Sequence, residues 1–224
     1  MLIDFGDTLA YIDKEGSMRY KKALFSIQRE YGYQGSLESF VSAFDDTIGN
    51  SMKGELKNLR EFWILLLENL GSHSKPTALI EEMEKIRSRY STIVFKLHIG
   101  AHRVLEVLQM KYRLALVSNC AIGTYEVMED LGLIEYFDCV TLSYRVGVRK
   151  PDRRIYVEAL KCLELEPHES IFVADEISDL EGAKDVGMRT MLVLQGEHTT
   201  HEAKDPNFKP DFQCNRVSKI LKFL

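Results

Sequence analysis

The first nine residues of the chain join a short apolar run to groups that could do chemistry. Residues 1–3 predict a buried strand, and Asp4 follows it directly, with Asp7 and Thr8 close behind. Burying an unpaired carboxylate costs free energy, so a charged group at this end of a strand needs a reason. Ligands of open α/β sheets bind at the carboxyl ends of the strands. We therefore interpret Asp4 as a functional residue rather than as a simple turn residue.

Three later segments also place polar groups at strand ends or helix starts. They are Ser118–Asn119 after the apolar run Leu114–Val117, Lys150 before Pro151 and Asp152, and Asp175 with Asp179 after Ile171–Ala174. Alone, Ser118 would be a helix N-cap and Lys150 a surface lysine. Together, a carboxylate, a hydroxyl, a lysine and a carboxylate pair suit phosphoryl transfer. Hard oxygen ligands hold Mg²⁺, while a fixed cation and hydrogen-bond donors hold the phosphoryl oxygens.

Two periodicities indicate the elements that position these groups. Apolar residues at three- and four-residue spacing predict helices over Met18–Tyr31, Leu37–Ile48, Leu56–Leu70 and Thr77–Ser91. From Ile99 onward, helices alternate with apolar runs, of which 139–142 and 190–194 are two more predicted strands, and a helix over Val217–Phe223 closes the chain. This alternation predicts a parallel sheet covered by helices on both faces. Since the first strand belongs to that sheet, the helical block is an insertion after it.

Composition places the chain among ordinary globular proteins. Its 224 residues are 45% hydrophobic and carry a formal net charge of −5, which argues against a nucleic-acid or anionic-membrane surface. The apolar stretch Phe62–Leu67 is too short to span a membrane, and no secretory signal is evident. Four scattered cysteines form no Cys-x-x-Cys pair, so we expect reduced, buried thiols. We expect a cytoplasmic protein.

The order of the four motifs resembles the haloacid dehalogenase-like hydrolase superfamily over nearly the whole chain. The stretches Gly147–Tyr156 and Val173–Met188 carry the resemblance most specifically. It implies an α/β fold with a Rossmann-like parallel sheet, helices on both faces and an inserted, all-helical cap. The core domain would comprise residues 1–15 and 92–224, and the cap residues 16–91.

The resemblance also implies a role for each motif residue. Asp4 would be the nucleophile that forms an aspartyl-phosphate, and Lys150 would neutralise it and the transferring group. Ser118 would bind the phosphoryl oxygens, with Asn119 and Thr8 as further substrate-binding residues. The implied cofactor, Mg²⁺, would be held by Asp4, the carbonyl of Gly6 and Asp175, supported by Asp179. The expected function is a phosphatase of small phosphorylated metabolites.

The sequence departs from the family pattern at Gly6, where most of its phosphatases carry an acid/base aspartate. Asp7 stands where a glycine is usual, and its role is open between a hydrogen-bonding turn residue and a substitute acid. Two alternatives follow: a dehalogenase-type hydrolase, which needs neither Mg²⁺ nor the Asp175 and Asp179 pair, or a catalytically impaired binding or regulatory protein. The retained pair favours the phosphatase.

Other candidates are less specific. His198 and His201 have metal-like spacing, but a loop without a third ligand favours solvated histidines. Tyr20, Lys53 and Arg60 are candidates to face the cleft and select the substrate. The sequence indicates neither the substrate nor the oligomeric state.

Overall fold

The computed structural model describes residues 1–72, 76–195 and 205–223. Within these residues the main sheet has six strands in the order β5-β4-β1-β6-β7-β8, all parallel. They are β5 (Cys139–Leu142), β4 (Ala115–Ser118), β1 (Leu2–Ile3), β6 (Ile171–Ala174), β7 (Arg189–Val193) and β8 (Phe212–Cys214). The predicted α/β fold is confirmed, and the first strand belongs to the sheet, where it lies between β4 and β6.

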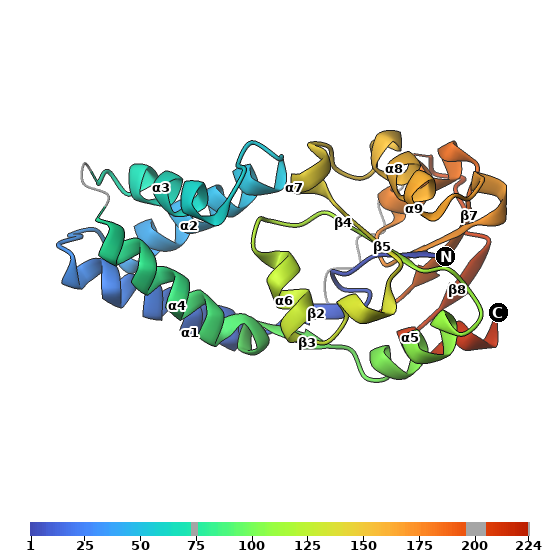
Figure 1. Cartoon of the computed structure of the whole chain (residues 1–224), viewed down its shortest axis with the longest axis horizontal. Coiled ribbons are helices and arrows are strands. Elements are labelled where there is room, and N and C mark those ends of the chain that lie inside the picture. The colour runs from blue at the N-terminus through green and yellow to red at the C-terminus, as the bar shows by residue number, and fades with distance from the viewer. Residues whose placement is uncertain (73–75, 196–204, 224) are drawn as a thin grey trace.

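Each face of the sheet buries its own apolar cluster, because successive side chains of a strand point to opposite faces. Ile3 packs with one cluster and Leu2 with the other. Helices α5 (Ala101–Gln109) and α6 (Thr124–Asp130) and the 3₁₀ helix η3 (Val217–Lys222) cover the first face; α8 (Arg153–Leu163) and α9 (Ile177–Val186) cover the second. The three layers are visible in Figure 1. The closing helix was expected at this place, and the structure makes it 3₁₀.

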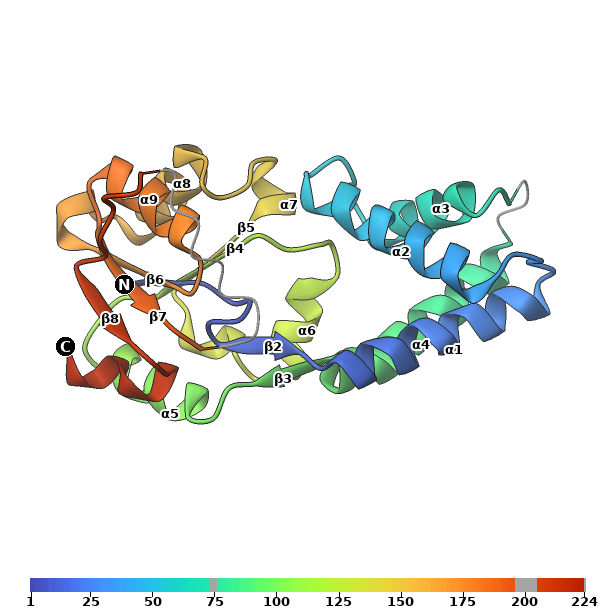
Figure 2. The same ribbon diagram turned by 180° about the vertical axis from the view of Figure 1, so that it is seen from behind.

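Four further helices form the inserted block: α1 (Lys14–Glu30), α2 (Leu37–Met52), α3 (Leu59–Asn69) and α4 (Thr77–Val94). Their own apolar cluster includes Leu24, Phe40 and Trp63, all fully buried. Side-chain caps at Asp13, Ser36 and Asn58 fix where the first three helices begin. The block lies beyond the edge of the sheet (Figures 1 and 2), and no described helix is both long and apolar enough to cross a membrane.

A two-stranded antiparallel ribbon joins this block to the sheet. Its strands are β2 (Ala10–Ile12), through which the chain enters α1, and β3 (Phe95–Leu97), through which it leaves α4. Neither strand was predicted, because each has only three residues, too few to show an alternating pattern. The division into residues 1–15 with 92–224 and residues 16–91 stays a prediction.

The cysteines depart from expectation. Cys139 of β5 and Cys162 of α8 form a disulfide, with their Cα atoms 6.2 Å apart, whereas Cys120 and Cys214 are free and buried. The prediction of four reduced cysteines is therefore wrong for this pair. The two cysteines meet because α8 packs beside β5, a tertiary contact that their spacing in the sequence does not reveal.

Candidate active site

The carboxyl ends of the three central strands bring the predicted groups together. Asp4 follows β1, Ser118 ends β4 and Asp175 follows β6, and all three are buried. The backbone N–H of Asp4 donates to the carbonyl of Val173 at 2.9 Å, which extends the pairing of β1 and β6 to the site itself. The sheet edge therefore positions these side chains as the sequence predicted.

Lys150 lies at the centre of the cluster. Its Nζ is 2.7 Å from Asp4 Oδ1 and 2.8 Å from Asp179 Oδ2, and the lysine is 5% exposed. Asn119 fixes the backbone of Lys150, because its Oδ1 accepts from the Lys150 N–H at 2.7 Å and its Nδ2 donates to the Lys150 carbonyl at 3.0 Å. In this structure Asn119 thus positions the lysine.

Thr8 and Asp175 form a second contact across the site. The Thr8 hydroxyl donates to Asp175 Oδ1 at 2.9 Å and accepts from the Asp175 N–H at 3.1 Å. Both hydrogen bonds orient Asp175 toward Asp4. Thr8 therefore holds a carboxylate of the cluster, and its predicted contact with substrate stays a prediction.

The cluster holds more carboxyl groups than ammonium groups. Burial raises the pKa of Asp4 to about 6, against the opposing effect of Lys150, and burial together with the Asp4 charge raises the pKa of Asp175 to about 8. Burial alone would lower the pKa of Lys150, but Asp179 and Asp4 raise it overall, so this ammonium stays charged. The cluster thus holds three buried carboxyl groups and one ammonium, which contacts Asp4 and Asp179.

The oxygen atoms of the cluster fit a divalent cation. Asp4 Oδ1 accepts from Lys150 and from the N–H of Phe5, which leaves Asp4 Oδ2 without a donor among the described residues; the same holds for Asp175 Oδ2. No group of three or more His, Cys, Asp or Glu side chains in the described part of the chain could hold a metal. A cation here would bind two carboxylates, the Gly6 carbonyl and water, a hard-oxygen set that suits Mg²⁺.

Gly6 and Asp7 form the turn after the nucleophile position. A β-carbon at position 6 would have no other atom within 4 Å beyond its chain neighbours, and the φ of Gly6 is not in the left-handed region. Asp7 does adopt that region, with φ of 50°, which aspartate tolerates better than most residues. Asp7 also lines the cavity in front of the site.

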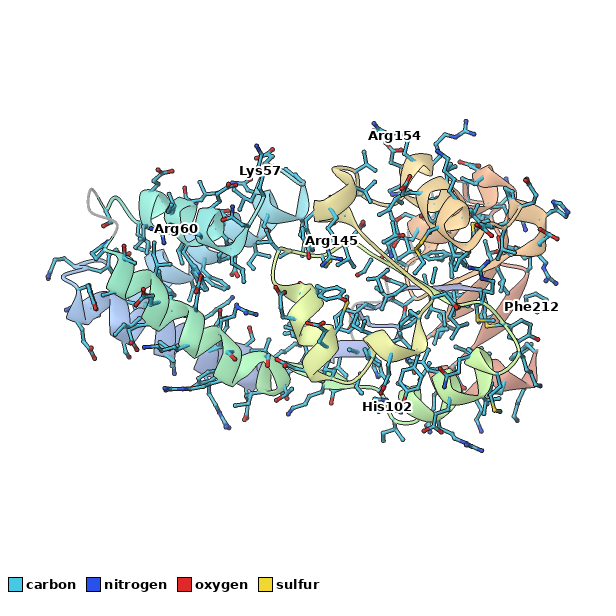
Figure 3. All side chains as sticks on the ribbon, in the orientation of Figure 1. Lys57, Arg60, His102, Arg145, Arg154 and Phe212 are labelled. Atoms are coloured by element: carbon cyan, nitrogen blue, oxygen red, sulfur yellow. A yellow bond between two sulfur atoms is a disulfide. The ribbon has the colours of Figure 1, made fainter. Side chains whose placement is uncertain are left out.

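Of the three proposed cleft residues, only Tyr20 lines this cavity. Lys53 and Arg60 are exposed and do not line it; Figure 3 shows Arg60 on the inserted helices. Arg87 and Trp63 do line it, and neither was predicted to face the cleft. Their helical spacing indicates a buried face but not which neighbour that face meets. His198 and His201 lie outside the described residues.

Comparison with known proteins gives three results. A family model described as haloacid dehalogenase-like hydrolase matches residues 35–193. A glyceraldehyde 3-phosphate phosphatase from Methanopyrus kandleri is 30% identical over 120 residues, 53% of this chain and 52% of that protein, so the match spans about half of that relative. A protein of the same name from Pyrococcus furiosus is 24% identical over the whole chain and 92% of its own length.

Among solved structures, a 2-haloacid dehalogenase from Pseudomonas syringae pv. Tomato DC3000 superposes with a TM-score of 0.74 and 19% identity. The superposition covers 99% of this chain and 95% of that one. At this identity the likeness concerns the fold.

Proposed function

The chain belongs to the haloacid dehalogenase-like hydrolase family, and on that premise we propose that it is a Mg²⁺-dependent phosphatase of small phosphorylated molecules. The observation that carries the proposal is the composition of the buried cluster: Asp4 and Asp179 share the Lys150 ammonium, and Asp175, held by Thr8, adds a third carboxyl group. The raised pKa values of Asp4 and Asp175 indicate that one ammonium does not stabilise all three carboxylates, and a divalent cation would supply the missing positive charge. The names of the relatives support phosphate esters as substrates.

In the proposed reaction, Asp4 attacks the phosphorus atom of the ester. A bond forms between a carboxylate oxygen of Asp4 and phosphorus, and the bond between phosphorus and the ester oxygen breaks, so the organic group leaves as an alcohol once this oxygen is protonated. Lys150 and the Phe5 N–H hold Asp4 Oδ1 at 2.7 Å each, which orients the carboxylate for this attack. Water then hydrolyses the aspartyl-phosphate, which releases inorganic phosphate and restores Asp4.

Positive charge stabilises the phosphoryl group as it transfers. Lys150 supplies one fixed charge, and Ser118, at the end of β4, supplies a hydroxyl donor. Mg²⁺, when bound by Asp4, Asp175 and the Gly6 carbonyl, would supply the rest, with Asp179 supporting its waters. The leaving oxygen needs a proton, and Asp7 is the carboxylate of this turn that lines the cavity.

The dehalogenase alternative predicts a different charge pattern. Such an enzyme has no need of Asp175 and Asp179, yet both are buried here and are fixed by Thr8 and Lys150 respectively. The binding-protein alternative depends on Gly6 alone. The intact cluster therefore favours phosphoryl chemistry over both.

One set of assays tests the proposal. Purified protein is given phosphate esters and 2-haloacids, each with Mg²⁺ or with EDTA, and Asp4→Asn is the matched control. We expect Mg²⁺-dependent phosphate release that the variant lacks, and a phosphorylated Asp4 in rapidly quenched protein by mass spectrometry. Halide release that persists in EDTA would support the dehalogenase instead, and no turnover of either class would support the binding protein.

A further inference from the structure

A cavity of about 410 Å³ lies between the inserted helices and the candidate active site. Its wall on the sheet side includes Gly6, Asp7, Ser118 and Asn119, so a phosphoryl group at Asp4 would place the rest of the substrate in this space. Cavities of this size hold drug-sized ligands. The body of a triose phosphate would leave much of the cavity unfilled.

The opposite wall, contributed by α1 to α4, is mainly apolar and carries five aromatic side chains. Tyr20, Phe44, Phe62, Trp63 and Tyr90 line it, and neighbouring rings hold one another in place: the centroids of Tyr20 and Phe44 are 5.7 Å apart, and those of Phe62 and Trp63 are 5.0 Å apart. Several polar groups of this wall already have protein partners: Lys21 pairs with Asp45, and the Ser91 hydroxyl donates to Asp130. Burying ligand hydroxyls without partners is unfavourable. The wall favours an apolar, planar ligand body.

The charged groups of this wall differ in whether they are paired. Lys21 Nζ is 2.7 Å from Asp45 Oδ1, so this pair is already neutral. Within the described residues, Arg87 has no carboxylate within 4.0 Å; its Nη1 makes only a long contact, 3.5 Å, with the carbonyl of Gly123. Arg87 is therefore a cation without a counter-ion at the cavity wall.

Two buried donors of the wall also have no hydrogen-bond partner among the described residues: Arg87 Nε and Trp63 Nε1. Trp63 as a whole is fully buried. Native proteins rarely bury donors without partners, and each such donor needs an explanation. An acceptor group supplied by a bound ligand would satisfy them.

We propose that the substrate is a phosphate monoester with an apolar, ring-sized body that carries a carboxylate or a similar acceptor. The aromatic wall binds the ring, and Arg87 binds the acceptor. This inference rests on the proposed function for the phosphate end only. It separates this chain from enzymes that are selective for small polyhydroxylated phosphates.

Trp63 gives a readout that needs no turnover, because it is the only tryptophan of the chain and lines the cavity. Its fluorescence is followed during titration with methylphosphonate, benzylphosphonate and 4-carboxybenzylphosphonate, which are not hydrolysed, in the presence of Mg²⁺. Burying the ring should tighten binding at least about tenfold over the methyl compound. A charge-assisted contact with Arg87 should add roughly another tenfold.

Arg87→Met keeps much of the apolar stem and removes the charge. We expect it to abolish the gain from the carboxylate and to leave the gain from the ring. Arg60→Met is the matched control, since Arg60 is an exposed arginine of the same four helices that does not line the cavity. Should Arg87→Met fail to fold, the three ligands on the unmodified protein still measure both gains.

Several results would overturn the inference. Equal affinities for methylphosphonate and benzylphosphonate would refute the ring-sized body of the proposed substrate. Equal affinities for benzylphosphonate and 4-carboxybenzylphosphonate would refute its acceptor group. Equal weakening of all three phosphonates and of inorganic phosphate by Arg87→Met would assign Arg87 to the phosphoryl group instead. Hydrolysis of glyceraldehyde 3-phosphate without any preference for 4-carboxybenzyl phosphate would leave the proposed function standing and this inference refuted. Ring-selective phosphonate binding without any hydrolysis would do the reverse.

Discussion

Under the proposed function, Gly6→Asp should raise turnover of phosphate esters with poor leaving groups. Position 6 can accept the side chain, because its β-carbon would meet no atom within 4 Å and its φ lies outside the left-handed region. The new carboxyl group would follow the nucleophile by two residues and line the same cavity, where it can protonate the leaving oxygen and then activate water.

The expected increase in turnover is the contribution of general acid–base catalysis to the rate. It is typically worth ~10²–10⁴-fold, or about 2.7–5.4 kcal/mol of activation free energy. The gain should be near that range for propyl phosphate, whose alkoxide needs a proton. It should be smaller for 4-nitrophenyl phosphate, whose leaving group is stable as an anion. Gly6→Asn is the control, since it has the same size but no acid.

Steady-state turnover of both esters by the three proteins, with melting temperatures, tests this reasoning. A folded Asp variant that gains nothing over Asn on propyl phosphate would show that another group already supplies the proton. Asp7 is then the first candidate, and Asp7→Asn should lose activity selectively on the alkyl ester.

Three further predictions concern the buried cluster. Asp4→Asn should abolish turnover yet raise the melting temperature of the metal-free protein at pH 8 in calorimetry, because it removes a buried charge; a lowered melting temperature would contradict this. Folding raises the pKa of Asp4 to about 6 and that of Asp175 to about 8, so the folded state binds more protons than the unfolded state between these values and their ordinary ones. The free energy of unfolding of the metal-free protein should therefore fall as the pH rises from 4 to 8. Mg²⁺ should raise the melting temperature more at pH 8 than at pH 5. Lys150→Met should lower the free energy of unfolding, measured by urea titration, by about 3–5 kcal/mol, because Asp4 and Asp179 lose the ammonium that they contact. A loss below about 1 kcal/mol would mean that water already screens the charges of these two carboxylates.

Most of the helices and strands could be predicted from the sequence, because each is indicated by the residues within its own short stretch of the chain. The predicted strands 139–142 and 171–174 have the observed bounds, since continuous apolar runs between turn residues indicate buried parallel strands. The strands β2, β3 and β8 were not predicted, because three residues are too few to show the apolar pattern of a strand. The Cys139–Cys162 disulfide was not predicted, because a disulfide depends on tertiary contact.

The candidate site divides in the same way. Asp4, Lys150, Asp175 and Asp179 could be predicted to converge, because the ends of parallel strands meet at one edge. That Lys150 contacts both Asp4 and Asp179, and that Asn119 holds its backbone, required the structure. The residues of the cavity wall were the hardest to predict from the sequence. Arg87 and Trp63 have the same helical spacing as core residues, and this spacing does not show whether a side chain packs against another helix or faces a cleft.

The ribbon of β2 and β3 has a consequence for how this protein can change over evolutionary time. Both crossings between the helices and the sheet lie side by side, joined by the hydrogen bonds from His98 N–H to the Leu9 carbonyl at 2.9 Å and from Asp13 N–H to the Val94 carbonyl at 2.7 Å. Paired strands lie roughly 4.8 Å apart, so any helical unit whose two ends are that close can join there. We therefore expect that another helical insertion can join the sheet at these two positions and change the substrate range while the carboxylate cluster stays in place.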